Sequence, residues 1–280
     1  MKKILYAVVV LFLPLAANAV VTGMADNTAN LSRIAPQAIA SDPCDGSILS
    51  VINRPSFGDT PCTVHEDMWL VEGGFTHFNY TDNGSGYAVP NLEMRYGLPY
   101  ENEIGVRLPN YVTETADPRT AGSSAFSFSY KHELAHIEDG IFSVEAVATM
   151  PSGSAQFGNA KGGFILSGVF AYDITPEVAF SAMLGAGTQS QPSASGGGSY
   201  FTVNPFALLS WRPLTQWQFF GEVGGQSSMG PGQGAGMICD GGIQFMVTPE
   251  IEFDAEAGTK LTNQFAGLDN YVSAGFGILF

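Results

Sequence analysis

The chain has 280 residues, a formal net charge of −15 at pH 7 and only 13% charged residues. Soluble domains usually contain roughly 25% charged residues, so a chain this poor in charge is unusual among them. The sequence also lacks a basic patch, which argues against nucleic acid as a partner. It is rich instead in small and aromatic residues, with 34 Gly, 20 Phe and 10 Tyr.

Residues 1–19 have the pattern of a cleaved secretory signal peptide. Lys2 and Lys3 precede an apolar stretch at residues 4–15, which is too short to span a bilayer, and Ala17-Asn18-Ala19 supplies a cleavage site. Every later apolar run is interrupted by Gly, Glu, Asp or Pro, so we expect no transmembrane helix. If the protein lies in a membrane it has to be a closed barrel, because only helices and closed barrels satisfy their backbone groups in lipid.

Residues 20–65 do not resemble strands and are expected to form a periplasmic or lumen-inserted arm. Prolines recur among Ser, Asp and Asn, and the one apolar patch lies at residues 48–52. Cys44 and Cys62 lie close together in this arm, which predicts a disulfide in an oxidising compartment, whereas Cys239 is alone. Two unpaired thiols or a metal site are the alternatives, and the metal site lacks nearby His and Cys ligands.

Twelve segments in which apolar and polar residues alternate follow in the expected barrel domain, residues 66–280. Such alternation is typical of strands with one apolar face and one wet face. The segments are 67–80, 88–97, 101–111, 122–132, 140–150, 161–173, 176–187, 200–212, 216–226, 236–247, 250–260 and 270–280.

The connections between these segments alternate in length. Short ones are expected at 98–100, 133–139, 174–175, 213–215 and 248–249, and longer loops at 81–87, 112–121, 151–160, 188–199, 227–235 and 262–269. Barrels of the bacterial outer membrane have an even number of strands, short periplasmic turns and longer external loops. The sequence therefore predicts an all-β, transmembrane, antiparallel up-and-down β-barrel of about 12 strands, with both ends in the periplasm and an N-terminal non-barrel arm.

Aromatic residues near the expected strand ends support this prediction. Trp69, Trp211, Trp217 and Phe280 fall beside periplasmic ends, and Tyr111, Tyr200 and Tyr271 lie near the opposite ends. Two aromatic girdles at the membrane–water boundaries are typical of membrane barrels. A soluble sandwich, the competing fold, would scatter these rings or bury them centrally. The terminal strand that ends on Phe280 is also where we expect the outer-membrane assembly machinery to bind.

Several motifs resemble a known outer-membrane family. The stretch from Arg95-Tyr96-Gly97-Leu98 to Glu103-Ile104-Gly105-Val106-Arg107-Leu108-Pro109 is similar to a hairpin of the transporters assigned to the meta-cleavage pathway of phenol degradation. The turns at 171–176 and 246–251 and the segment 53–62 resemble the same family, so the similarity covers about residues 50–280. It implies a Gram-negative outer-membrane barrel that conducts small organic compounds. The matching motifs are structural and transfer no binding residues.

A column of carboxylates is the strongest feature of the expected inner face. Glu252, Asp254 and Glu256 share one face of a strand about 6.6–6.8 Å apart, with Asp240 and Glu222 on neighbouring strands. Charges at these positions are costly in lipid, so the column has to face the lumen. We interpret it as a cation-favouring pore wall, and the alternative is an ordinary hydrated interior.

Three cations are expected to point inward from the second to fourth strands: Arg95, Arg107 and Lys131. If they lie opposite the acidic column, they would create an electric field across a constriction of the lumen. Local ion pairs, such as one between Arg95 and Glu103, are the alternative.

Catalysis and cofactor binding are not expected. His132 and His136 have an i, i+4 spacing, but this is not a metal motif outside a helix. His77, near an external strand end, is the one candidate for a lipid-facing hydrolase. The sequence therefore favours a passive outer-membrane channel for small solutes, surrounded by lipid, over a structural or surface-interaction barrel with a plugged lumen. An outer-membrane enzyme is the least favoured alternative.

Overall fold

The computed structural model describes residues 44, 47–81, 84–115, 119–262 and 267–280. The expected signal peptide and residues 20–43 of the arm lie outside these residues. Among the described residues, the short helix α1 (Ile48–Val51) precedes the first strand, and a 3-10 turn, η2 (Ser193–Ser195), lies in a loop. No helix in the described part of the chain is long and apolar enough to cross a membrane.

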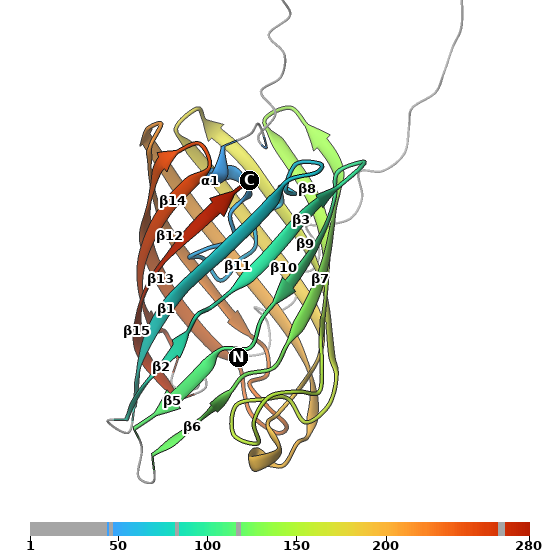
Figure 1. Ribbon diagram of the computed structural model, residues 1–280, viewed down its shortest axis with the longest axis vertical. Coiled ribbons are helices and arrows are strands. Elements are labelled where there is room, and N and C mark those ends of the chain that lie inside the picture. The colour runs from blue at the N-terminus through green and yellow to red at the C-terminus, as the bar shows by residue number, and fades with distance from the viewer. Residues whose placement is uncertain (1–43, 45–46, 82–83, 116–118, 263–266) are drawn as a thin grey trace, which may run out of the picture. The chain divides into compact units, whose positions relative to one another are not determined.

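In the part of the chain that the structure describes, fifteen antiparallel strand segments form one closed sheet. They are β1 (Trp69–Tyr80), β2 (Ser85–Val89), β3 (Glu93–Leu98), β4 (Asn102–Arg107), β5 (Tyr111–Glu114), β6 (Thr120–Ser123), β7 (Ser127–Ile137), β8 (Gly140–Thr149), β9 (Gly163–Thr175), β10 (Val178–Ser190), β11 (Ser199–Leu214), β12 (Trp217–Gln226), β13 (Gly236–Thr248), β14 (Ile251–Lys260) and β15 (Leu268–Leu279). The last strand pairs with the first, from Leu70 opposite Leu279 to Phe75 opposite Ala274 and beyond, and this closes the barrel (Figure 1).

The fifteen segments correspond to twelve barrel strands, as the sequence predicted. β1 pairs with β2 along one half and with β3 along the other, so β2 and β3 are two parts of one strand. The next two strands are divided in the same way into β4 and β5, and into β6 and β7. The sequence predicted three continuous strands here. The first two breaks contain Pro90 and Pro109, which have no N–H to donate to the ladder.

Short turns and long loops lie at opposite ends of the barrel, which are called the short-turn end and the loop end. The turns are 99–101, 138–139, 176–177, 215–216 and 249–250, and each lies within or beside a short connection expected from the sequence. The short-turn end also carries the start of β1 and the end of the chain, where the Trp69 N–H donates to the Phe280 carbonyl at 2.7 Å.

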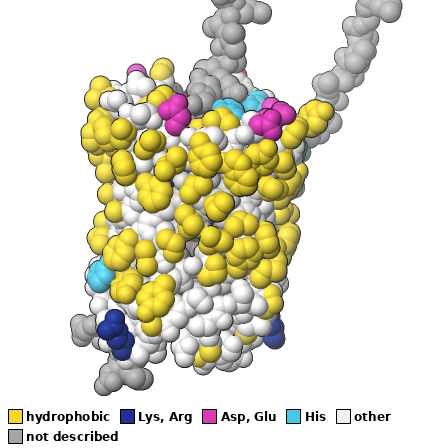
Figure 2. Space-filling view, viewed as in Figure 1, with side chains coloured by type: hydrophobic (Ala, Val, Ile, Leu, Met, Phe, Trp, Pro, Cys, Tyr) yellow, Lys and Arg dark blue, Asp and Glu magenta, His cyan; other side chains and the backbone are white. Residues whose placement is uncertain are grey.

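Side chains alternate between a buried inner face and an exposed apolar outer face. On β14, Glu252 is fully buried and Asp254 nearly so, whereas Phe253 is 54% exposed between them. Large apolar side chains point outward from strands all around the barrel, and hydrophobic side chains are spread widely over the visible wall (Figure 2). A wall of this kind would be unfavourable in water and is suited to lipid.

The barrel interior holds the segment that precedes β1. Residues 47–65, called the plug, include α1, which lies inside the barrel near the short-turn end (Figure 1). Ile48, Leu49, Val51 and Ile52 of the plug pack in one buried cluster with inward side chains of the wall. The wall residues in this cluster are Leu70, Ile141, Met246 and Leu279.

Candidate functional site

The plug is an irregular segment, so its backbone N–H groups need acceptors outside regular secondary structure. Four wall carboxylates supply them. Glu72 accepts from the N–H groups of Asn53 and Arg54 at 3.2 and 2.9 Å, and Glu222 accepts from Gly58 at 3.0 Å and from the Ser56 hydroxyl.

The end of the plug is held in the same way. Glu133 accepts from the Thr63 N–H at 2.6 Å and from its hydroxyl at 2.8 Å. Glu103 accepts from the Val64 N–H at 2.7 Å. Each carboxyl group has two oxygens that can accept hydrogen bonds, so these inward acids are well suited to dock a backbone.

Arg54 is the main cationic side chain of the plug. Its guanidinium donates to both oxygens of Asp254, at 3.2 and 3.0 Å, and to the Ser273 hydroxyl at 3.1 Å. The Asp254 side chain is buried in this pair and that of Arg54 is nearly so. The guanidinium occupies the space beside Gly74 and Gly275, where any side chain would collide with it.

Asp59 and Arg107 form a second ion pair between plug and wall. The Arg107 guanidinium donates to both Asp59 oxygens, at 2.9 and 3.1 Å, and to Glu93 at 2.9 Å. Burial raises the pKa of the Asp59 carboxyl, but the Arg107 guanidinium, a hydrogen bond with Glu145 and the Lys131 charge together outweigh burial and hold this pKa well below its ordinary range. Asp59 is therefore ionised at neutral pH.

The disulfide expected from the sequence is present. Cys44 and Cys62 are bonded, which closes a loop over the apolar part of the plug, and Cys239 on β13 is a free thiol. The Cys62 carbonyl also accepts from Arg95 at 3.4 Å.

The five acidic residues expected to line the lumen all lie on inward positions of β12, β13 and β14. Asp254 and Glu222 contact the plug directly. Glu256 accepts a hydrogen bond from Tyr271, and Glu252 is fully buried near Ile48 and Ile52 of the plug. Asp240 pairs across the sheet with Glu222.

The three expected cations also lie inside, but they do not form a separate basic arc. Arg95 is fully buried and donates to Glu103 at 2.7 Å and to Glu72 at 3.0 Å. Lys131 is fully buried too, 4.0 Å from Glu103. The sequence reasoning overlooked the inward carboxylates of Glu72, Glu93 and Glu145, which lie on β1, β3 and β8. Charge on this side is therefore balanced locally by ion pairs.

The aromatic residues expected at the short-turn end lie there. Trp69, Trp211 and Phe280 are exposed on the outer surface, and Trp217 is half-buried beside Phe245. Tyr271 differs from its expected place in the opposite girdle. It is buried and points inward, because it precedes the outward Val272 in the alternation of β15.

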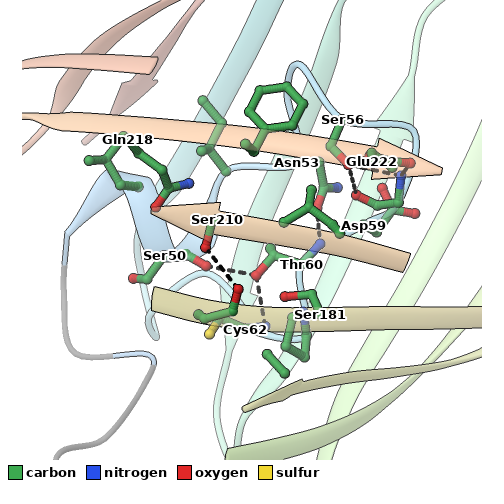
Figure 3. Close-up of a pocket in the computed structure, with 18 of the residues that line it drawn as sticks. Ser50, Asn53, Ser56, Asp59, Thr60, Cys62, Ser181, Ser210, Gln218 and Glu222 are labelled. Carbon is green, nitrogen blue, oxygen red and sulfur yellow. Dashed lines mark hydrogen bonds between the residues drawn. The ribbon is translucent and has the colours of Figure 1, made fainter. Parts of the chain in front are cut away.

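Two cavities that the described residues line lie between the plug and the wall. The first, of about 140 Å³, lies between plug residues 49–62 and strands β9 to β12. Figure 3 shows its polar lining, with Asn53, Ser56 and Thr60 of the plug facing Ser181, Ser210 and Gln218 of the wall. The second, of about 400 Å³, extends toward the loop end. Asp59, Met183 and Phe206 line both cavities, which places the two spaces next to each other.

Comparison with known proteins supports the fold. No protein-family model matches the sequence, and no curated protein matches it either. An outer membrane channel from Pseudomonas putida F1 has a similar structure, with 9% identity and a TM-score of 0.63 over 81% of this chain and 100% of that one. The NanC porin is similar at 11% identity and a TM-score of 0.53, covering 75% of this chain and 98% of its own.

The KdgM porin is another similar structure, at 6% identity and a TM-score of 0.53 over 75% of this chain and 99% of that one. At these identities the likeness establishes the fold, a closed antiparallel β-barrel of the kind found in outer-membrane channels. The structural neighbours are channels and porins rather than enzymes.

Proposed function

We propose that the protein is an outer-membrane channel that passes small solutes through the space between the plug and strands β9 to β12. The fold supports a position in the outer membrane, because its exposed wall is apolar and its structural neighbours are outer-membrane channels. Export by a cleaved signal peptide and recognition of the terminal strand by the assembly machinery are parts of this proposal.

The observation that carries the proposal is the pair of adjoining cavities. The first cavity, called the inner cavity, reaches Asp173 and Arg212 near the short-turn end. The second, called the outer cavity, reaches Gln189 and Tyr200 near the loop end. A water molecule needs roughly 10–15 Å³ of cavity volume, so the inner cavity, with about 140 Å³, has room for about ten water molecules. A route of this size suits small solutes.

The lining favours neutral solutes with some apolar surface. Several wall side chains along the inner cavity are small, such as Ala171, Ser181 and Ser210, and the junction with the outer cavity adds Met183 and Phe206. Charged groups that line the route are largely paired, as Arg107 is with Asp59. Small organic compounds, the class implied by the resemblance to the meta-cleavage transporters, fit this lining.

The competing function is a surface or structural barrel whose plug seals the lumen. This function is supported by the number of wall side chains that form hydrogen bonds or ion pairs with the plug. The two functions differ in one measurable property, because a sealed barrel gives no steady current across a planar bilayer.

Narrowing the inner cavity tests the proposal. Ser181 lines it and pairs with Leu208 across the sheet, whereas Leu184 on the same strand is 59% exposed on the outer surface. We expect Ser181→Trp to lower the single-channel conductance severalfold, and Leu184→Trp, the matched control, to leave it unchanged. Removal of residues 20–64 should raise conductance. No current from the native protein would support the sealed barrel, and equal conductance of both tryptophan variants would place the route elsewhere.

A further inference from the structure

Three side chains that the proposed route does not use converge at the short-turn end. The His136 Nε2 atom lies 3.0 Å from a Glu133 carboxylate oxygen and 3.6 Å from an oxygen of Glu101. One donor atom from each residue lies within 4.8 Å of the other two. Figure 2 shows histidine and acidic side chains beside one another on this rim.

A bulge in β7 brings His136 to the same face as Glu133. Residues three apart on a regular strand point to opposite faces. Here the pairing with β8 shifts by one residue, so Glu133 lies opposite Ser143 and His136 lies opposite Ile141. Ser143 and Ile141 are both fully buried inside the barrel. The extra residue therefore turns His136 inward, a role that bulges have next to functional sites.

The neighbouring turn positions Glu101. Tyr100 and Glu101 have φ values of 64° and 57°, in the left-handed region that non-glycine residues rarely adopt. The Glu101 carbonyl accepts from the Glu133 N–H at 3.1 Å and lies 3.2 Å from the His132 ring nitrogen Nδ1. The turn is thus fixed to the strand that carries the other two side chains.

The donor set is one that zinc prefers. Zn²⁺ binds His nitrogen and carboxylate oxygen at about 2.0–2.2 Å, and tetrahedral geometry then separates neighbouring donors by about 3.3–3.6 Å. The two separations from His136, 3.0 and 3.6 Å, are near this range. Three protein ligands leave a fourth position open to water.

The Glu133 carboxylate also accepts hydrogen bonds from the plug. The oxygen that faces His136 is Oε2, while Oε1 accepts the two hydrogen bonds from Thr63 of the plug. Hydrogen bonds of this kind orient metal ligands, and their loss typically weakens metal binding about 10–100-fold. The same carboxylate therefore links the rim cluster to the plug.

We propose that Glu101, Glu133 and His136 form a zinc-binding site on the rim of the barrel, and that zinc bound there strengthens the attachment of the plug at Thr63. The i, i+4 spacing of His132 and His136 did not indicate a metal site. The actual partners of His136 are an acid three residues earlier and an acid on a separate turn.

Zinc titration of the refolded full-length protein tests the site. Competition with a chromophoric chelator should show one zinc ion bound per chain in the native protein. His136→Ala and Glu101→Gln should each weaken binding at least tenfold, and Thr63→Val about tenfold through loss of one hydrogen bond to Glu133. His65→Ala, an exposed histidine at the end of the plug, is the matched control and should bind as tightly as the native protein.

Hydrogen exchange measures the link to the plug. Zinc should slow exchange of the Thr63 amide in the native protein and in His65→Ala, but not in His136→Ala. Absence of zinc binding by the native protein would overturn the proposal, as would unchanged affinity in His136→Ala. Equal competition by Ca²⁺ would assign the cluster to hard cations and exclude the imidazole as a ligand.

Discussion

Removal of the Arg54 guanidinium should release the plug from the barrel wall. In the Arg54→Met variant, Asp254 loses both hydrogen bonds of the ion pair and Ser273 loses one of two donors, because Thr76 still donates to it. Methionine retains part of the apolar stem, and the backbone N–H of residue 54 still bonds to Glu72. The substitution therefore removes the charge with little other change.

The size of the effect follows from the burial of Asp254. Removing one partner of a buried ion pair costs roughly 3–5 kcal/mol, because the remaining charge is left without compensation. We take the lower limit of this range, about 3 kcal/mol. Each 1.4 kcal/mol is a factor of ten, so the population with an undocked plug should rise about 100-fold.

Single-channel recording in planar bilayers measures this population as the fraction of time spent in a state of higher conductance. A second substitution, Asp254→Asn, removes the stranded charge, so the double variant Arg54→Met/Asp254→Asn should return toward native behaviour. Lys161→Met removes an exposed charge near the loop end and serves as the control. The reasoning is refuted if Arg54→Met opens no more often than the control, or if the double variant opens as often as Arg54→Met.

Three further predictions concern the wall, the disulfide and the charge of the route. Val272→Arg places a charge on the exposed face of β15 and should cost about 2–4 kcal/mol near the membrane centre; it should reduce the folded band in outer-membrane extracts, whereas Val272→Leu should not. Replacing Cys44 and Cys62 by Ser removes a crosslink over 18 residues, worth about 3 kcal/mol; protease should then cleave the plug faster than in the native protein, while an unchanged rate would exclude this role. Arg107 is the cation most exposed to the outer cavity, with a side chain 37% exposed, so Arg107→Gln should shift the reversal potential in a salt gradient toward cation selectivity; an unchanged potential would place the route away from Arg107.

The twelve strands were predictable because they depend on local pattern. Period-2 alternation, as on β14, separates the two faces of each strand without knowledge of its neighbours. Turn residues then separated consecutive strands, and the lengths of the connections predicted which strand ends lie at the same end of the barrel. The broken strands also had a local signal in Pro90 and Pro109, because proline within a strand pattern indicates an interruption.

The contacts of the plug were not predictable in this way. Arg54 and Asp254 are 200 residues apart, and their pairing depends on how the barrel closes around the plug. The inward position of His136 depends on a one-residue bulge, and alternation alone places it on the opposite face from Glu133. Such features change no hydrophobic period and leave little trace in the sequence.

The acidic column shows why the two kinds of information have to be combined. The sequence placed Glu252, Asp254 and Glu256 on one inward face and explained their charge by a hydrated, cation-favouring pore. In the structure, none of the three lines either of the two cavities between plug and wall, and Asp254 is bound to Arg54. A plug without strand partners needs acceptors for its N–H groups, and a barrel wall needs donors for its inward acids. Asp254 and the neighbouring Glu222 bind the plug in this way, so these two acids also form part of the surface on which the plug docks. Glu256 instead accepts a hydrogen bond from Tyr271 of the wall. In the proposed channel, selectivity would then depend on charges that line the route, such as Asp59 and Arg107.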